Sequence, residues 1–341
     1  MANVVFRVDA TKNIGLGHLM RCYALAEELV KNKKTCYFIS NIDSEKIVEK
    51  ITKSKITLEK ISNSPNANQD LNYLIDFSRN NNIDWIVTDH YEINSEYIKT
   101  IKDNGFNVLS IDDTAQTYYA PDIVVNQNIG SEKLKFRSDK NTRLLLGPKY
   151  VMIRDELLKR EKKRYHEDVK TILVTLGGMA YDTLTIQILR LLKEIIDDSV
   201  QIIVVIGPLN RVKSDLKSEM NRLSDSNFRF VFSPRTMLDL YLESDIAISA
   251  GGSSCYELSY FGIPNIIITI ASNQLNIAKE LDKENVSIYL GRNEDFSPNR
   301  FKENILKIID DKSLRKKMVE NGKRLVDGNG KKRIVDVMNN F

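Results

Sequence analysis

Residues 246–257 read IAISAGGSSCYE, so that a short β-branched run leads through two glycines into the start of a helix. A strand that ends in a glycine turn and continues as a helix is typical of α/β folds with parallel sheets. Backbone N–H groups without partners and the helix dipole favour an anion at such a point. Ser253 and Ser254 add hydroxyl donors. The stretch therefore predicts a phosphate site in a doubly wound α/β domain.

The same alternation of strand-like and helical segments extends along the chain on both sides of this stretch. A first series of strand-like runs covers 3–9, 35–40, 85–88, 107–111, 123–126 and 144–147. A second series covers 171–176, 201–206, 229–233, 246–250, 265–270 and 287–290. The pattern predicts two Rossmann-like parallel-sheet domains. Because ligands of such folds bind at the carboxyl ends of the strands, we expect the ligand in the cleft between the domains.

The length and one charged segment set the expected domain boundary. A chain of 341 residues is long enough for two domains, each with its own core. The segment 154–170 is strongly charged and separates the two series of strands. We therefore place the domains at 1–150 and 151–341, with the last helix able to pack back on the first domain.

Composition excludes several classes of protein. Lys and Arg total 50 and Asp and Glu total 46, so no concentrated basic face indicates a nucleic-acid partner. The cysteines at 22, 36 and 255 lack CxxC spacing, which argues against a disulfide framework or a zinc site and fits a reducing, cytoplasmic setting. No run approaches the roughly 18 apolar residues of a membrane span, so no integral membrane contact is expected.

A second glycine loop follows the first predicted strand. Residues 7–18 read RVDATKNIGLGH and turn on Gly15 and Gly17. The third glycine of a dinucleotide fingerprint would fall at Met20 and is absent. The loop therefore indicates close approach to a ligand without indicating a nicotinamide cofactor, and we expect no cofactor.

His18 is one of three histidines in the chain and stands at the expected start of a helix. A helix amino terminus disfavours the imidazolium, which leaves the neutral ring available as a base. Asp9, at the end of the preceding strand, could orient the ring by accepting one imidazole N–H. A surface or capping histidine is the competing interpretation, and the local sequence leaves the two nearly balanced.

Other polar groups after predicted strands have local as well as functional interpretations. Glu257 either forms a capping box with Ser254 or grips a ribose diol, and the local pattern favours the capping box. Gly178 follows another strand, where a simple strand-to-helix turn is sufficient. Asn273 and Gln274 supply amides able to bind hydroxyl or acetamido groups.

Taken in order, these segments resemble one family along essentially the whole chain. The motifs are Arg7-x-Asp9, Gly15-x-Gly17-His18-x-x-Arg21-Cys22, Asp89-His90-Tyr91, Gly177-Gly178, Ala250-Gly251-Gly252-Ser253-Ser254-x-x-Glu257, Asn273-Gln274 and Asp327-Gly328-x-Gly330-x-x-Arg333. They resemble the UDP-2,4-diacetamido-2,4,6-trideoxy-β-L-altropyranose hydrolases of pseudaminic acid biosynthesis and the related spore coat polysaccharide proteins. That family is similar to the glycosyltransferase that adds N-acetylglucosamine to the peptidoglycan lipid precursor, and the resemblance implies the glycosyltransferase-B fold.

The resemblance also implies roles for the residues. The first domain would hold the sugar and the catalytic group, and the second domain would bind UDP. His18 would activate or position water, Tyr91 and Asn273 would line the sugar pocket, and Glu257 would bind the ribose. From their places in the motifs we also expect Asp9 and Tyr91 at the catalytic site. The remaining substrate contacts would be Gly15, Gly17, Arg21, Asp89, Gly178, Ser253, Ser254 and Gln274. Asp182 stands further from the glycine pair than the aspartate of many relatives, which leaves the sugar's identity open.

The expected reaction is attack by water on the anomeric carbon, which releases UDP and the free sugar with inversion. UDP is a good leaving group, and no carboxylate-rich cage for a metal is visible, so we expect metal independence. An inverting glycosyltransferase and a non-catalytic nucleotide-sugar-binding protein are the alternatives. The oligomeric state stays open.

Overall fold

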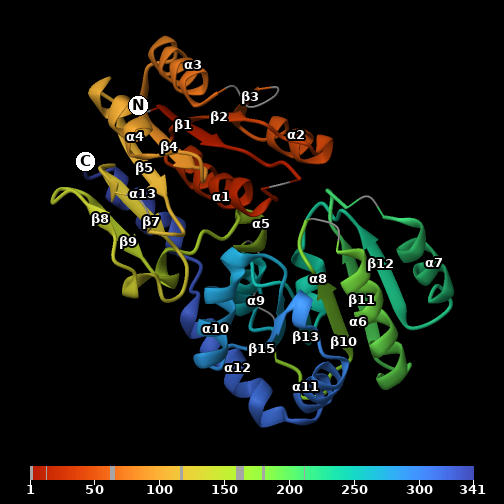
Figure 1. Cartoon of the computed structure of the whole chain (residues 1–341). Coiled ribbons are helices and arrows are strands. Elements are labelled where there is room, and N and C mark those ends of the chain that lie inside the picture. The colour runs from red at the N-terminus through yellow and green to blue at the C-terminus, as the bar shows by residue number, and fades with distance from the viewer. Residues whose placement is uncertain are drawn as a thin grey trace. The chain divides into compact units, whose positions relative to one another are not determined.

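The computed structural model describes residues 3–12, 14–61, 66–115, 118–158, 165–178, 181–210 and 212–341. The chain divides into two compact units (Figure 1). Unit 1 comprises Met1–Asp155 and Gly328–Phe341, and unit 2 comprises Glu156–Asp327. Much of the charged segment expected to link the domains, residues 159–164, lies outside the described residues.

Unit 1 is built on a seven-stranded parallel sheet of order β3-β2-β1-β4-β5-β7-β9. Its strands are β1 (Asn3–Val8), β2 (Thr35–Ser40), β3 (Ile56–Lys60), β4 (Ile83–Asp89), β5 (Asn107–Ile111), β7 (Ile123–Asn126) and β9 (Arg143–Leu146). Its helices are α1 (Gly17–Lys31), α2 (Glu45–Thr52), α3 (Ala67–Asn80), α4 (Ser95–Asp103) and α13 (Gly330–Met338), with short 3-10 turns at Ser131–Lys133 and Pro148–Tyr150. The short strands β6 (Tyr118–Tyr119) and β8 (Arg137–Ser138) pair separately.

Alternation along the strands of unit 1 fills two cores, one on each face of the sheet. Val4, Phe6 and Val8 of β1 pack into a core that includes buried side chains of α1, α2 and α13. Val5 points to the opposite face and packs with buried side chains of α3 and α4. Because both faces are covered, Val4, Val5 and Phe6 form a continuous apolar run rather than an alternation, as expected of a parallel sheet.

Unit 2 repeats the arrangement with a six-stranded parallel sheet of order β12-β11-β10-β13-β14-β15. Its strands are β10 (Thr171–Thr175), β11 (Gln201–Ile206), β12 (Phe228–Phe232), β13 (Ile246–Ser249), β14 (Asn265–Thr269) and β15 (Ser287–Arg292). Its helices are α6 (Asp182–Ile195), α7 (Ser214–Arg222), α8 (Leu238–Glu243), α9 (Ser254–Phe261), α10 (Leu275–Lys283), α11 (Pro298–Asp310) and α12 (Lys312–Leu325). Short turns lie at Ser272–Gln274 and Asn293–Asp295, and the one-turn helix α5 (Asp155–Leu158) begins where the chain leaves unit 1.

The prediction of two Rossmann-like parallel sheets is confirmed, and each strand expected from the sequence is present within one or two residues. The strand β3 was not expected. It lies at the edge of its sheet and is only partly buried, with Glu59 half-buried and Lys60 exposed. Charged side chains are typical of edge strands and obscure their hydrophobic pattern.

The helix α13 packs in unit 1 although it follows the last residue of unit 2 in the sequence. Ile334, Val335 and Met338 are buried in the core that α1 also covers. Lys331 is 2% exposed, and its Nζ lies 2.6 Å from Oδ1 of Asp155. The first residue of the helix, Gly330, lies directly against the backbone of 150–151. The closing glycine motif of the sequence therefore fixes this helix in place.

Candidate functional site

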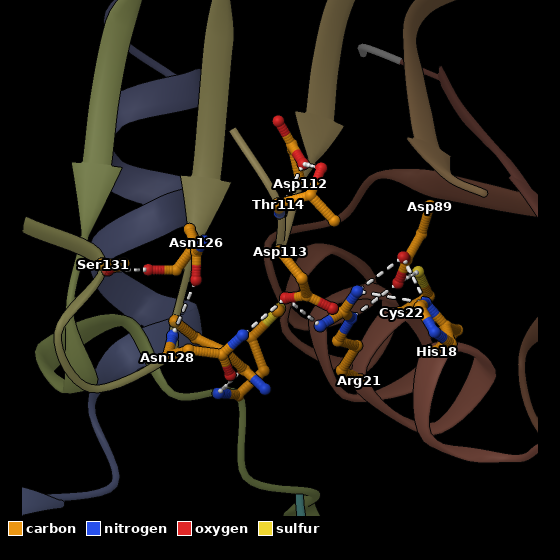
Figure 2. A network of polar contacts seen from close by, with 12 residues as sticks. His18, Arg21, Cys22, Asp89, Asp112, Asp113, Thr114, Asn126, Asn128 and Ser131 are labelled. Carbon is orange, nitrogen blue, oxygen red and sulfur yellow. Dashed lines mark hydrogen bonds and ion pairs between the residues drawn. The ribbon is translucent and has the colours of Figure 1, made fainter. Parts of the chain in front are cut away.

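The site in unit 1 is centred on His18, at the start of α1 (Figure 2). The loop before the helix turns at Gly15, whose φ of +84° favours glycine, and Gly17 is the first residue of the helix. His18 is 7% exposed, and its Nδ1 lies 2.6 Å from Oδ1 of Asp89, the last residue of β4. At this distance one proton must lie between the two atoms.

The state of Asp89 decides which atom carries that proton. Burial alone would raise the pKa of this carboxyl, but the charge of Arg21, the neighbouring His18 ring and hydrogen bonds from both lower it far below the ordinary value. Asp89 is therefore a carboxylate, and Nδ1 of His18 donates to it. This leaves the lone pair of the neutral ring on Nε2, where a base would need it.

Arg21 is placed as a support of this pair. Its Nε and Nη2 donate to the two oxygens of Asp89, each at 2.6 Å, and its Nη1 donates to Oδ1 of Asp113 at 2.9 Å. Arg21 is 7% exposed and Asp89 2%. Both residues were predicted as substrate contacts, whereas the structure pairs them with each other next to His18.

The prediction that Asp9 orients His18 is wrong, because Asp89 fills that position. Asp9 accepts hydrogen bonds from Nη1 of Arg7 at 2.6 Å and from the backbone N–H of Asn41 at 2.8 Å, and its Oδ2 lies 3.2 Å from Nε2 of His90. Burial would raise the pKa of Asp9, and the bonds from His90 and Arg7 lower it strongly instead. Asp9 therefore belongs to a separate buried cluster.

Tyr91 lies beside His18, as expected of a residue at the same site. The two rings meet edge to face, with their centroids 4.9 Å apart. The Tyr91 side chain is 52% exposed, so one surface of the ring covers the histidine and the rest is available to a ligand. An exposed aromatic ring next to a buried imidazole offers an apolar contact surface to a ligand.

The site in unit 2 is the glycine loop between β13 and α9. Gly251 is buried, Gly252, Ser253 and Ser254 are partly exposed, and α9 begins at Ser254. A Cβ at Gly251 would lie 3.0 Å from the Cβ of Gln274 and 3.2 Å from Cγ2 of Thr269, so these neighbours would have to shift by a few tenths of an ångström. A Cβ at Gly252 would meet only Nε2 of Gln274, at 3.9 Å. Packing within the described residues therefore gives no reason for glycine at 252.

The capping box favoured by the local sequence does not form. Ser253 rather than Ser254 is the residue before α9, and no side-chain cap is made there. Oε2 of Glu257 instead accepts a hydrogen bond from the hydroxyl of the buried Tyr241 at 2.7 Å. This carboxylate is therefore held in one position one turn into the helix, beside the glycine loop.

The remaining predicted residues of unit 2 divide into those near the loop and those with a local role. Gln274 packs on Gly251, and its Oε1 accepts a hydrogen bond from the backbone N–H of Ile270 at 2.9 Å. Asn273, next to it, is exposed. Gly178 lies against Gly207: a Cβ at Gly207 would come within 2.6 Å of the Cα of Gly178, so close packing of the two loops explains the glycine at 207.

Three contacts at the sites were not anticipated from the sequence. Asp113 accepts a hydrogen bond from Arg21, Asn128 donates one to Asp113, and His90 pairs with Asp9. Each follows a strand, which is the available signal, but the partner lies far away in the sequence. Within the described ranges, no group of three or more His, Cys, Asp and Glu side chains is arranged to hold a metal ion. Among the same residues, no helix is long and apolar enough to cross a membrane.

The depressed carboxyl groups predict acid sensitivity of unit 1. Asp9 and Asp89 stay ionised in the folded protein but bind protons at an ordinary pKa of about 4 when unfolded. Their stabilisation is complete above that value and is lost as pH falls toward the folded pKa values. We expect the free energy of unfolding to decrease from about pH 5 to about pH 3. Urea titrations that follow Trp85, the single tryptophan and a buried residue of β4, would measure this in unit 1. A constant free energy of unfolding over this range would contradict the assignment.

Comparison with known proteins identifies the fold. The profile of the glycosyltransferase family 28 C-terminal domain matches residues 171–337. The crystal structure of Acinetobacter baumannii MurG superposes with a TM-score of 0.70 at 13% identity, covering 100% of both chains. The two parallel-sheet domains therefore have the glycosyltransferase-B fold, as predicted.

Three relatives match this chain at identities of 24–27%. The chain is 27% identical over 314 residues to an uncharacterized protein of Methanocaldococcus jannaschii, covering 83% of this chain and 63% of that protein. It is 24% identical over 328 residues to the spore coat polysaccharide biosynthesis protein SpsG of Bacillus subtilis, covering 95% and 94%. It is 24% identical over 188 residues to the UDP-2,4-diacetamido-2,4,6-trideoxy-beta-L-altropyranose hydrolase of Campylobacter jejuni, covering 54% and 64%.

Proposed function

We propose that the protein hydrolyses a UDP-activated 2,4-diacetamido-2,4,6-trideoxy hexose at its anomeric C–O bond. The products are UDP and the free sugar, with inversion at the anomeric carbon, for nonulosonic acid or surface glycan synthesis. The names of the relatives and the glycosyltransferase-type fold support action on a UDP-sugar. The observation that carries hydrolysis is the buried His18–Asp89 pair, which leaves one imidazole nitrogen as a base.

The residues provide each part of the reaction. Nε2 of His18 takes a proton from water as the water oxygen attacks the anomeric carbon, and the bond from that carbon to the diphosphate oxygen breaks. Asp89 stabilises the imidazolium that forms. Such a base contributes about two to four orders of magnitude to the rate. The leaving diphosphate would bind at the start of α9, where backbone N–H groups and the hydroxyls of Ser253 and Ser254 face it.

The second loop supports a nucleotide through two details of its packing. Gly252 has space for a side chain within its own unit, so a ligand close to the backbone explains its absence. Glu257 is fixed by Tyr241 where a ribose diol would lie if the diphosphate occupies the helix start. Asn273 and Gln274 would contact hydroxyl or acetamido groups of the substrate.

Hydrolysis in heavy-oxygen water tests the proposal. The purified protein is incubated with a panel of UDP-di-N-acetylated sugars and no other substrate, and the products are followed by proton NMR and mass spectrometry. We expect the label in the sugar and an inverted anomer as the first product. Label in UDP would mean attack at phosphorus and would contradict the mechanism.

The glycine loop gives a separate prediction for UDP. We expect Gly252→Ala to weaken UDP binding by about 10- to 100-fold, since it displaces a phosphate from charge-assisted N–H bonds. The melting temperature should stay unchanged, because the new Cβ has room. Gly251→Ala is the matched contrast and should lower the melting temperature. Calorimetric titration with UDP measures the affinity, and unaltered binding by Gly252→Ala would remove the phosphate from this loop.

A glycosyltransferase is the second candidate, favoured by the match of residues 171–337 to family 28. An acceptor hydroxyl would then replace water at the same base. Turnover of the UDP-sugar alone separates the two, because a transferase requires its acceptor. Binding of UDP without turnover of any donor would instead favour a non-catalytic nucleotide-sugar-binding protein.

A further inference from the structure

The buried network below His18 continues past Asp89 to a second carboxylate. Figure 2 shows Arg21 between Asp89 and Asp113, which come from the ends of two neighbouring strands, β4 and β5. Oδ1 of Asp113 also accepts a hydrogen bond from Nδ2 of Asn128, after β7, at 2.7 Å. The Asp113 side chain is 12% exposed. The guanidinium is thus held along two of its edges and cannot rotate away from Asp89.

The formal charges of this network can be counted with His18 neutral and with His18 protonated. When the imidazole is neutral, the charges of Arg21, Asp89 and Asp113 sum to −1. When the imidazole is protonated, its positive charge brings the sum to zero. Without Asp113, the same proton would leave a buried cluster with one uncompensated positive charge, which is costly. Two other groups near the ring do not alter this sum. Burial and the charge of Asp89 raise the pKa of the Cys22 thiol, which stays neutral, and the Tyr91 ring meets the imidazole edge to face.

We infer that Asp113 is a positioning residue for the reaction: through Arg21 it fixes the Asp89 carboxylate and balances the charge that His18 acquires. The inference rests on the proposed function for its kinetic part. It assigns Arg21 to the support of the base rather than to the substrate contacts, because three of its N–H groups are directed at the two carboxylates.

The test compares Asp113→Asn with Asp122→Asn. Asp122 is matched in burial, with a side chain 15% exposed, and pairs with Lys102 away from the network. We expect Asp113→Asn to lower kcat by about 10- to 100-fold at nearly constant KM, since it loosens the base without touching substrate. The acid limb of the kcat profile should move to lower pH by on the order of one unit, because removal of a negative charge disfavours the imidazolium. Asp122→Asn should show neither change.

A readout without substrate separates this inference from the proposed function. The His18 ring nitrogens are followed by NMR against pH, and the His18→Asn spectrum assigns them. We expect the titration midpoint of His18 to move to lower pH in Asp113→Asn. Asp113→Glu retains the charge, so it should keep the midpoint while slowing turnover, and it serves as the second variant if the asparagine form folds poorly.

The outcomes test the role of Asp113 and the proposed hydrolysis separately. An unchanged midpoint in Asp113→Asn overturns the inference even if the protein hydrolyses UDP-sugars. A raised KM at constant kcat also overturns it, because Arg21 would then bind substrate. A shifted midpoint in a protein that turns over no UDP-sugar supports the network and rejects the proposed function.

Discussion

His18→Asn is expected to lower kcat for UDP-sugar hydrolysis by about two to four orders of magnitude, the usual contribution of a positioned base. The amide cannot accept the proton of water as imidazole does. UDP affinity should remain close to that of the wild type, because the nucleotide is assigned to the loop at 251–254. Initial rates by product NMR and calorimetric titration with UDP measure the two quantities.

A matched substitution separates loss of the base from a general effect of removing a histidine. His166 is in unit 2, with a side chain 58% exposed and paired with Asp245 at 3.1 Å. His166→Asn should keep full turnover. If His18→Asn retains wild-type kcat, His18 is not the base and the proposed mechanism fails.

Gly330→Ala is expected to have the largest effect on stability. A Cβ there would lie 2.2 Å from the backbone oxygen of Val151 and 2.4 Å from the carbonyl carbon of Tyr150. Neither atom can move without shifting the segment that leads out of unit 1. Overpacking typically costs about 1–3 kcal/mol and more where the neighbours cannot move, so α13 should detach or unit 1 should unfold at lower urea concentrations.

Tryptophan fluorescence can follow this effect directly. The ring of Trp85 meets that of Phe341, just after α13, with centroids 5.4 Å apart. Detachment of the helix should therefore change the emission before the whole unit unfolds. Lys332→Ala, on the exposed side of the same helix, should leave the urea midpoint unchanged. Equal midpoints for the two variants would show that Gly330 is not tightly packed.

The fold could be predicted from the sequence because its signals are local. Each buried parallel strand is a short apolar run, and each run is followed by a turn that the next helix continues. The position of α13 was only an option in the sequence, since the residues that fix it, Gly330 and Lys331, meet partners near 150–155. Edge strand β3 was not predicted because its exposed charged side chains obscure the alternation of apolar and polar residues.

The candidate site was predicted in part for the same reason. His18, Tyr91 and the glycine loop at 251–254 stand out by residue type and by their place after a strand. The partner of His18 could not be identified in this way. Asp9 and Asp89 both stand at the end of a strand, and they differ only in the direction in which each side chain points. Asp9 points to the face that carries Arg7, and Asp89 points to the face covered by α1. Strand parity, counted from the buried residues, would have favoured Asp89.

The return of α13 to unit 1 has a consequence for how the protein is made. Unit 2 is continuous in sequence, so all of its strands have left the ribosome by the time residue 327 emerges. The core of unit 1 still lacks Ile334, Val335 and Met338 at that moment. The unit translated first is thus the last to be completed, and the nascent chain must carry an open apolar surface until its final helix arrives.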